Sequence, residues 1–493
     1  MLTGANALPQ AEPARTSNLG LPHLGDDSDM TPAAERRLGD RIARELYRDP
    51  DYIDDPVIME YVQGIWQPLL AAARLRGELP PEIDAAYAWE ILLGKDRSVN
   101  AFALPGAYLG LHLGLVSVVS SRDELASVLA HELSHVTQRH IARLITRQSA
   151  QAPWMMGALI LAALAASKNP GAANAVMVGG QAVAAQSQLN FSRDMEREAD
   201  RVGFGVMTQA GYAPQAFVTM FEKLQQASRL NDSGNFPYLR SHPLTTERMA
   251  DMQARIPDTV GASAGPLTME HAQMAARARV LSNAHVDALL SWAGDAEPAR
   301  LARLAPPAQA GALYGAALAA ARLRDFSAAQ ALVTRLQGLV ATDPAASRLA
   351  RLLAAELALV AGQPARTLQI LQGVSGAGRA ALFLQAQAGI LAGQSAQVTQ
   401  SLQTWLADHP RDAQGWQLLA SAYAAQGKTL SAVRAEAEVN IAQLDYPAAL
   451  TRLKAAQDLA RRGAGAGDHI EASIVDTRAR QVDLLVREQA LER

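Results

Sequence analysis

The sequence predicts a mainly α-helical protein in which an α+β domain with a small sheet is followed by an α-helical solenoid. Short apolar runs with the period of strands lie between residues 87 and 119, and segments of helical spacing lie on both sides of them. After about residue 300 the chain is rich in Ala, Leu and Gln, a composition that favours helices. With 493 residues, the chain is long enough for several domains.

The composition excludes several classes of protein and site. Hydrophobic residues make up 49% of the chain, which is too much for a disordered protein. The formal net charge of -3 argues against nucleic acid as the main partner, because binding to phosphates needs a basic face. The sequence has no cysteine, so disulfides, thiol nucleophiles and cysteine-based zinc sites are excluded.

Two segments bear on export and membranes. We expect residues 1–30 to be a flexible leader left from an export signal region, although no intact signal peptide is visible because they hold no apolar run. The longest apolar run, Ala152–Ala166, has 15 residues, fewer than the roughly 20 that a helix needs to span a bilayer. No transmembrane helix is therefore expected. Two interpretations of this run stay open: a buried core helix, or an apolar lid or membrane-surface contact.

Helix and strand signals follow in order. Thr31 suits the N-cap of a first helix, with Pro32 in its first turn, and a second helical segment covers Pro56–Arg76. A small sheet should include a hairpin with strands at Val99–Leu104 and Leu109–Leu115 around Pro105-Gly106.

Ser121 and Glu124 then form a capping box, a pair that marks the start of a helix. We expect this helix to run to roughly Thr146. Another helix is expected from about Ser192 to Ala210, ending at Gly211.

The C-terminal part repeats at steps of 34 residues, the period of tetratricopeptide helix pairs. The clearest unit carries Trp416, Leu419, Ala420 and Tyr423 at the expected spacing, and two earlier units are degenerate. A generic Ala- and Leu-rich helical bundle is the alternative. The predicted organisation is a leader at 1–30, the α+β domain at 31–257, a linker with connecting helices at 258–305 and the repeat domain at 306–490.

The segment His131-Glu132-Leu133-Ser134-His135 lies within the helix that Ser121 caps. Residues four apart share a helix face, so His131 and His135 aim both imidazoles at one ion. Two neutral imidazoles suit Zn(II), and an open catalytic site needs one more protein ligand. Glu132 is offset by one residue, so it would take a proton from water on the ion and hand it to a leaving amine.

A second acidic helix is expected to complete the site. Glu196 and Asp200 are four residues apart and share a face. Glu196 suits the third zinc ligand, and Asp200 suits the acceptor of a hydrogen bond from a ligand imidazole. Glu198 points away from that face and is expected to be solvated. The alternative is that Glu196, Arg197 and Asp200 form surface ion pairs.

Two other histidines need separate treatment. His140 comes nine residues after His131, on the opposite side of a continuous helix, so it should not share the ion and is expected to be exposed or capping. His242 lies in Ser241-His242-Pro243, on a loop. A lone loop histidine is usually exposed, so the residues alone leave its role open.

Three motifs together resemble the HtpX-like and CAAX-prenyl-protease-like gluzincin family of zinc metallopeptidases: Asn100-Ala101-Phe102-Ala103, His131-Glu132-x-x-His135 and Glu196-x-x-Ala199-Asp200. The resemblance covers nearly all of residues 30 to 490. The added repeat array resembles those members that work in the periplasm of Gram-negative bacteria. The chain departs from the integral-membrane members, which carry transmembrane helices beside the motif.

The resemblance implies roles for individual residues. Residues 31–257 would form a gluzincin metallopeptidase domain that binds one zinc ion through His131, His135 and Glu196, with Glu132 as general base. His242 would regulate access to the metal or stabilise the oxyanion. An edge strand that pairs with extended substrate would be formed by Asn100, Ala101, Phe102 and Ala103.

The same resemblance implies a function. The protein would be a periplasmic zinc endopeptidase that degrades misfolded or stalled outer-membrane β-barrel proteins and assists their assembly, with the repeat domain contacting the β-barrel assembly machinery. Two rivals stay open: a chaperone or scaffold whose zinc site is latent, and a housekeeping peptidase of the cytoplasm.

Overall fold

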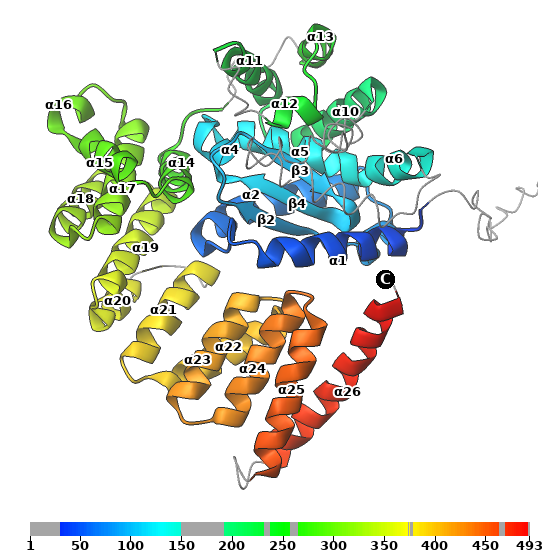
Figure 1. Cartoon of the computed structure of the whole chain (residues 1–493). Coiled ribbons are helices and arrows are strands. Elements are labelled where there is room, and N and C mark those ends of the chain that lie inside the picture. Colours follow the sequence, from blue (N-terminus) through cyan, green and yellow to red (C-terminus); the bar gives the residue numbers. More distant parts are fainter. Residues whose placement is uncertain are drawn as a thin grey trace, which may run out of the picture.

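The computed structural model describes residues 30–148, 192–230, 237–256, 265–372, 374, 378–462 and 469–491. Within these ranges a small sheet and helices α1 to α13 form the N-terminal part, and the later helices form a curved C-terminal array (Figure 1). The prediction of a mainly α-helical chain with one small sheet is confirmed. Residues 1–29 of the expected leader and the apolar run Ala152–Ala166 lie outside the described residues.

Within the described residues the sheet has four strands in the order β1-β2-β4-β3. β2 and β4 are parallel, whereas β3 and β4 are antiparallel and joined by the short turn η1, which confirms the predicted hairpin. β3 therefore forms one edge of the sheet. The bounds are β1 Tyr52–Ile53, β2 Glu90–Gly94, β3 Ala101–Leu104, η1 Pro105–Ala107 and β4 Tyr108–His112.

The second hairpin strand ends earlier than its alternating leucines predict. β4 stops at His112, and Leu113 begins helix α4 (Leu113–Val118). Leu113 and Leu115 are both fully buried. Gly114 lies so close to the backbone that a Cβ there would be 2.1 Å from Arg97 O. The prediction of a strand through Leu115 is therefore wrong. A short helix that is buried on several sides can have leucines at alternate positions, which is also the pattern of a strand.

Three helices precede the hairpin. Helix α1 (Pro32–Arg48) starts as predicted, since Thr31 Oγ1 accepts a hydrogen bond from Ala34 N at 3.2 Å. Helix α2 (Pro56–Leu75) begins after Asp55, and α3 (Pro81–Ala86) follows. α2 buries much of its length in the largest hydrophobic cluster, which also contains side chains of the sheet and of α5.

Helix α5 (Arg122–Thr137) has Ser121 as its N-cap, as predicted, with Ser121 Oγ accepting from Glu124 N at 3.1 Å. The prediction that it continues to Thr146 is wrong. Arg139 adopts a left-handed φ of 52°, and a separate helix, α6 (His140–Gln148), begins directly after it. Such a φ costs a non-glycine residue roughly 1–2 kcal/mol. Here the Arg139 guanidinium donates to Met30 O and to Glu35 Oε2, contacts that no local sequence signal announces.

Helix α10 (Arg193–Gln209) confirms the helix predicted before Gly211, which has a φ of 87°. It packs along α5 at Gly203, where a Cβ would lie 3.0 Å from Ala130 O. The close approach brings the side chains of both helices to one place. Helices α11 (Gln215–Leu230), α12 (Pro237–Ser241) and α13 (Thr246–Arg255) complete the described N-terminal part.

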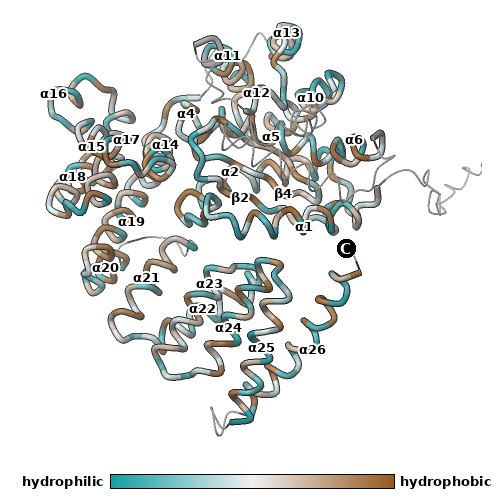
Figure 2. The backbone as a smooth tube through the Cα atoms, in the orientation of Figure 1, coloured by the Kyte–Doolittle hydropathy of each residue, from teal (hydrophilic) through white to brown (hydrophobic). Residues whose placement is uncertain are grey.

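The C-terminal array consists mostly of consecutive paired helices. Helices α19, α21, α23 and α25 begin at Pro344, Arg379, Ala413 and Tyr446, which are 35, 34 and 33 residues apart. Hydrophobic and hydrophilic residues are interspersed along the helices of the array (Figure 2). The spacing agrees with the period in the sequence, and the tetratricopeptide assignment stays a prediction.

The bounds of this part are α14 Met269–Ser282, α15 Val286–Ala293, η2 Gly294–Ala296, α16 Pro298–Leu301, α17 Pro306–Arg322, α18 Phe326–Leu339, α19 Pro344–Val360, α20 Pro364–Leu371, α21 Arg379–Leu391, α22 Ser395–Asp408, α23 Ala413–Ala425, α24 Thr429–Ala442, α25 Tyr446–Arg461 and α26 His469–Leu491. The largest hydrophobic cluster continues from α2 and α5 into α14, α17 and α19. The hydrophobic core is therefore continuous across the predicted domain boundaries at 257 and 305. The division into domains stays a prediction.

Within the described residues, the array contacts the N-terminal part near α2, near α1 and where α14 packs on α4. Near α2, the buried Arg277 lies 2.7 Å from Asp55 Oδ2 and 2.7 Å from Glu356 Oε2. Near α1, Arg44 Nε donates to Leu444 O at 2.8 Å. Leu444 has a left-handed φ of 62°, and its buried side chain joins a hydrophobic cluster with residues of α1. The array is thus fixed to the N-terminal part near both of its ends.

Candidate metal centre

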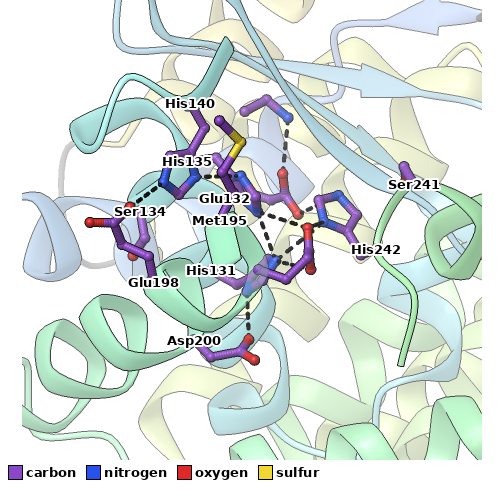
Figure 3. A network of polar contacts seen from close by, with 12 residues as sticks. His131, Glu132, Ser134, His135, His140, Met195, Glu198, Asp200, Ser241 and His242 are labelled. Atoms are coloured by element: carbon purple, nitrogen blue, oxygen red, sulfur yellow. Dashed lines mark hydrogen bonds and ion pairs between the residues drawn. The ribbon is translucent and has the colours of Figure 1, made fainter. Parts of the chain in front are cut away.

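His131 and His135 lie one turn apart on α5, and their side chains are almost fully buried. Their Nε2 atoms are 3.0 Å apart, and their rings meet edge to face at 70°. Figure 3 shows both rings directed toward the same point. The spacing of four residues therefore brings two imidazole nitrogens together as the sequence predicts.

Helix α10 adds two carboxylates on the predicted face. Glu196 Oε2 lies 3.5 Å from His131 Nε2, and Glu196 Oε1 lies 3.5 Å from His135 Nε2. Asp200 Oδ1 lies 3.0 Å from Nδ1 on the other side of the His131 ring. Both carboxylates are 1% exposed, so the alternative of surface ion pairs does not describe them.

His242, directly after α12, is buried in the same place. Its Nδ1 lies 3.0 Å from Glu196 Oε1 and 3.3 Å from His131 Nε2. The Tyr238 ring packs against the His242 ring, with centroids 4.7 Å apart. A loop histidine is usually exposed, but His242 is buried because the short helix α12 before it places this loop against α5 and α10.

His131, His135, Glu196 and His242 each offer one ligand atom, and these atoms lie within 4.8 Å of one another. Imidazole nitrogens with one carboxylate oxygen form a donor set that suits zinc. Beside them, the buried Glu132 Oε1 has no hydrogen-bond partner within the described residues and lies 3.4 Å from His242 Nε2. A buried carboxylate oxygen without a hydrogen bond is costly unless another group, such as a metal-bound water, satisfies it. The residues present therefore fit a zinc ion.

Arg248 is a site residue that the sequence did not reveal. Its Nε and Nη2 atoms donate to Asp200 at 2.6 and 2.8 Å, and its Nη1 lies 2.7 Å from Glu196 Oε2. Its only sequence signal is its place on the helix after His242. The buried guanidinium lies between two carboxylates and offsets their mutual repulsion.

These contacts set the protonation of the metal-free site. Burial alone would lower the pKa of His131, but Asp200 and Glu196 raise it to about 9. Burial and the adjacent His131 hold the pKa of His135 well below its usual value. Burial would raise the pKa of Glu196, yet His242 and His131 hold it well below its usual value. Glu196 is thus ionised and His135 neutral, whereas His131 is protonated and must lose its proton to bind a metal.

The edge strand β3 lies directly beside Glu132. Ala103 N donates to Glu132 Oε2 at 3.0 Å, and burial raises the pKa of Glu132. Asn100 O accepts a hydrogen bond from His112 N at 3.0 Å just before β3 begins. Because backbone groups of an antiparallel strand face its partner at every second residue, the backbone N–H and C=O of Phe102 also face β4. Those of Ala101 and Ala103 face away from β4. Ala101 and Ala103 are therefore the residues whose backbone forms the edge.

His140 lies outside the group of donor atoms, as expected, but the expectation that it is exposed or capping is wrong, and so is the expectation that Glu198 is simply solvated. His140 is fully buried, with Nδ1 at 3.0 Å from His135 Nδ1 and Nε2 at 3.0 Å from Glu198 Oε2. Glu198 also lies 2.9 Å from Arg143 Nη1, so it is paired rather than simply solvated. The expectations assumed one continuous helix, and the break at Arg139 turns the His140 ring back toward His135.

The structure also bears on membrane insertion. Among the helices in the described ranges, none combines the length and the apolar character that crossing a bilayer requires.

Comparison with known proteins shows what the N-terminal part of the chain is similar to. Residues 61–256 match the family described as Peptidase family M48. The chain is 33% identical over 332 residues to a "Putative beta-barrel assembly-enhancing protease" of Vibrio cholerae, an alignment that covers 66% of this chain and 64% of that protein. It is 32% identical over 257 residues to the "Beta-barrel assembly-enhancing protease" of Escherichia coli, which covers 52% of this chain and 51% of that protein.

A more distant relative is the "Mitochondrial metalloendopeptidase OMA1" of Arabidopsis thaliana, 33% identical over 161 residues, 33% of this chain and 30% of that protein. A solved human IFIT1 dimer is similar over 74% of this chain and 73% of its own, but 14% identity and a TM-score of 0.28 support no conclusion. The chain thus spans 64% and 51% of the length of the two bacterial relatives. The matched region holds α5 and α10 with their buried donor atoms, and residues 61–256 are therefore similar to peptidase family M48.

Proposed function

We propose that this protein is a zinc-dependent endopeptidase of the periplasm that degrades misfolded or stalled outer-membrane β-barrel proteins and assists their assembly. The observation that carries the proposal is the convergence of buried donor atoms from His131, His135 and Glu196 beside Glu132 and the edge strand β3. The names of the two bacterial relatives support β-barrel proteins as the substrate class.

Each residue of the site has a proposed task. His131, His135 and Glu196 hold the zinc ion, which when bound supplies Lewis acidity that polarises a peptide carbonyl and acidifies water. Glu132 is the general base, which takes the proton of the attacking water and returns it to the leaving amine. Asp200 holds Nδ1 of His131, so that Nε2 faces the ion.

Substrate would bind as an added strand on β3. The edge backbone of Ala101 and Ala103, with Asn100 and Phe102 beside it, offers hydrogen bonds to an extended peptide. Ala103 N donates to Glu132, so a substrate strand that takes over this hydrogen bond would lie next to the general base. This arrangement suits an enzyme that cleaves unfolded segments.

The position of His242 supports a latent resting state. Its Nδ1 belongs to the same group of donor atoms, at the place where a catalytic zinc site leaves a position open for water or substrate. We propose that His242 blocks this position at rest and moves away when substrate binds. The same observation favours the second candidate function, a chaperone or scaffold whose zinc site stays latent.

We further propose that the C-terminal array binds client proteins or the β-barrel assembly machinery and presents clients to the zinc site. The contacts of the array with α1 and α2 support this, because they hold it next to the N-terminal part. Fractionation of cells that make the native protein would check the location, and recovery in the cytoplasm would contradict the proposal.

Metal analysis and one isosteric variant test the catalytic proposal. The purified protein should contain about one zinc ion per chain, and His131→Ala should lose it. Glu132→Gln should keep the zinc but cleave a denatured outer-membrane β-barrel protein about 10²–10⁴-fold more slowly. A wild-type protein without zinc would overturn the proposal. If Glu132→Gln keeps its zinc and fully complements a null strain, the chaperone or scaffold function is favoured instead.

A further inference from the structure

The second ligand histidine has an unusual neighbour on its outer side. The Nε2 atom of His135 faces the group of donor atoms, whereas its Nδ1 lies 3.0 Å from Nδ1 of His140. The opposite nitrogen of His140, Nε2, lies 3.0 Å from Glu198 Oε2. Figure 3 shows the continuous line from His135 through His140 to Glu198. Both nitrogens of the fully buried His140 ring thus meet a polar atom.

The local fold explains why His140 reaches this position. In a helix that continued past Thr137, a residue five positions after His135 would point elsewhere. The left-handed Arg139 ends α5 and lets α6 start at His140. Glu198 comes from α10, which packs along α5, and Arg143 of α6 lies 2.9 Å from the same carboxylate oxygen. The three residues in this line of contacts thus come from three helices: His135 from α5, His140 from α6 and Glu198 from α10.

Counting protons gives the direction of each hydrogen bond, and this step rests on the proposed function. If His135 Nε2 gives its lone pair to zinc, the proton of the neutral ring must be on Nδ1. His135 Nδ1 then donates, and His140 Nδ1 must accept. The neutral His140 ring consequently carries its proton on Nε2 and donates it to the Glu198 carboxylate. Every atom of the line has a partner without any charged histidine.

We infer that His140 and Glu198 are positioning residues that fix the tautomer and orientation of His135 for zinc binding. They do for His135 what Asp200 does for His131, but through an inserted imidazole. Outer partners of this kind typically change metal affinity by 10–100-fold when removed. A purely structural His140, which only fills space beside α5, would not need an acceptor at Nδ1 and a donor at Nε2.

Zinc affinity, measured by competition with a chromophoric chelator, tests the inference. His140→Leu fills similar space without an acceptor and should raise the zinc Kd by about 10–100-fold. His140→Asn places an amide oxygen where Nδ1 was and should stay much closer to the wild type. Glu198→Ala, a change at a partly exposed site, should weaken zinc binding in the same direction. The control is Asp194→Ala on the same helix, whose side chain is 93% exposed and which should bind zinc normally.

Nitrogen-15 spectra of histidine rings in the zinc-loaded wild type provide a second readout. The proton should be on Nδ1 of His135 and on Nε2 of His140. A proton on Nδ1 of His140 would overturn the inference, and so would equal zinc affinities of His140→Leu, His140→Asn and the wild type. Either result would leave the proposed peptidase intact if the wild type binds zinc and Glu132→Gln abolishes cleavage. A wild type without zinc would instead reject the peptidase itself.

Discussion

The two ligand histidines of the candidate zinc site are supported in different ways. His131 contacts the Asp200 carboxylate directly, and Arg248 buries that carboxylate with a side chain only 4% exposed. His135 reaches Glu198 through His140, and the Glu198 side chain is 31% exposed. The His131 side is therefore closed within the core, whereas the His135 side extends to solvent. We therefore expect the two sides to respond differently to pH and salt.

The largest expected contrast concerns the two arginines. Arg248→Met leaves the Asp200 and Glu196 carboxylates buried without their cation, which should destabilise the metal-free protein by about 3–5 kcal/mol. Arg143→Met removes a pair whose arginine side chain is 42% exposed, and the loss should stay within about 1 kcal/mol. Urea unfolding of both variants checks the contrast. Equal losses would mean that the two sides do not differ in the proposed way.

Zinc affinity should show the next largest contrast. Asp200→Asn keeps the shape of the side chain but removes the charge beside His131, and the zinc Kd should rise by about 10–100-fold. Glu198→Gln still offers an oxygen to His140, so its effect should be clearly smaller. Chelator competition measures both. A larger effect of Glu198→Gln would reverse the ranking of the two sides.

Opposite responses to pH are expected in the metal-free protein. The pKa of His131 is raised to about 9, so its contribution to stability is fully present below about pH 6.5 and is lost as the pH rises through about 9. Burial lowers the pKa of His140, so its contribution is present above about pH 6.5 and is lost as the pH falls toward its lower pKa.

Thermal unfolding across pH compares the wild type with one variant for each side. The stability advantage of the wild type over Asp200→Asn should shrink as the pH rises from about 6.5 to about 9. Its stability relative to His140→Asn, which cannot titrate, should fall below about pH 6.5. Parallel pH profiles for the two variants would contradict the assignment of opposite shifts to the two sides.

The smallest expected effect is that of salt. Raising the ionic strength from 0.1 to 1 M shortens the Debye length from about 10 to about 3 Å, which screens exposed pairs more than buried ones. The stability difference between wild type and Arg143→Met should therefore disappear at 1 M NaCl. The difference for Arg248→Met should largely remain, and its loss at high salt would show that water reaches this pair.

Local signals predicted much of the His131 side. His131, His135, Glu196 and Asp200 lie on two capped helices, and spacing of four residues is a property of any helix. The contacts among them required only that α10 pack along α5. Arg248 and His242 come from a later loop and helix, and the position of a loop relative to two distant helices cannot be derived from local spacing.

The His135 side shows where local signals fail. The break between α5 and α6 rests on Arg139, whose left-handed conformation depends on contacts to Met30 and Glu35, over 100 residues earlier. No glycine or proline marks it, so a continuous helix was the natural prediction and placed His140 wrongly. The prediction that Leu113 and Leu115 lie in a strand was wrong for a related reason. They lie in a short helix that is buried on several sides, so its hydrophobic residues have the period of a strand.

Leu444 has a consequence for the order of events during synthesis. Its carbonyl accepts from Arg44, a contact between residues 400 positions apart. A ribosome adding about 5–20 residues per second needs roughly 20 to 80 seconds to make the chain between them. Helix α1 and the sheet are thus complete long before their partner emerges, and the long loop must close last. The newborn N-terminal part therefore spends this interval with its Leu444 contact surface uncovered, and the contact can form only after residue 444 has been made.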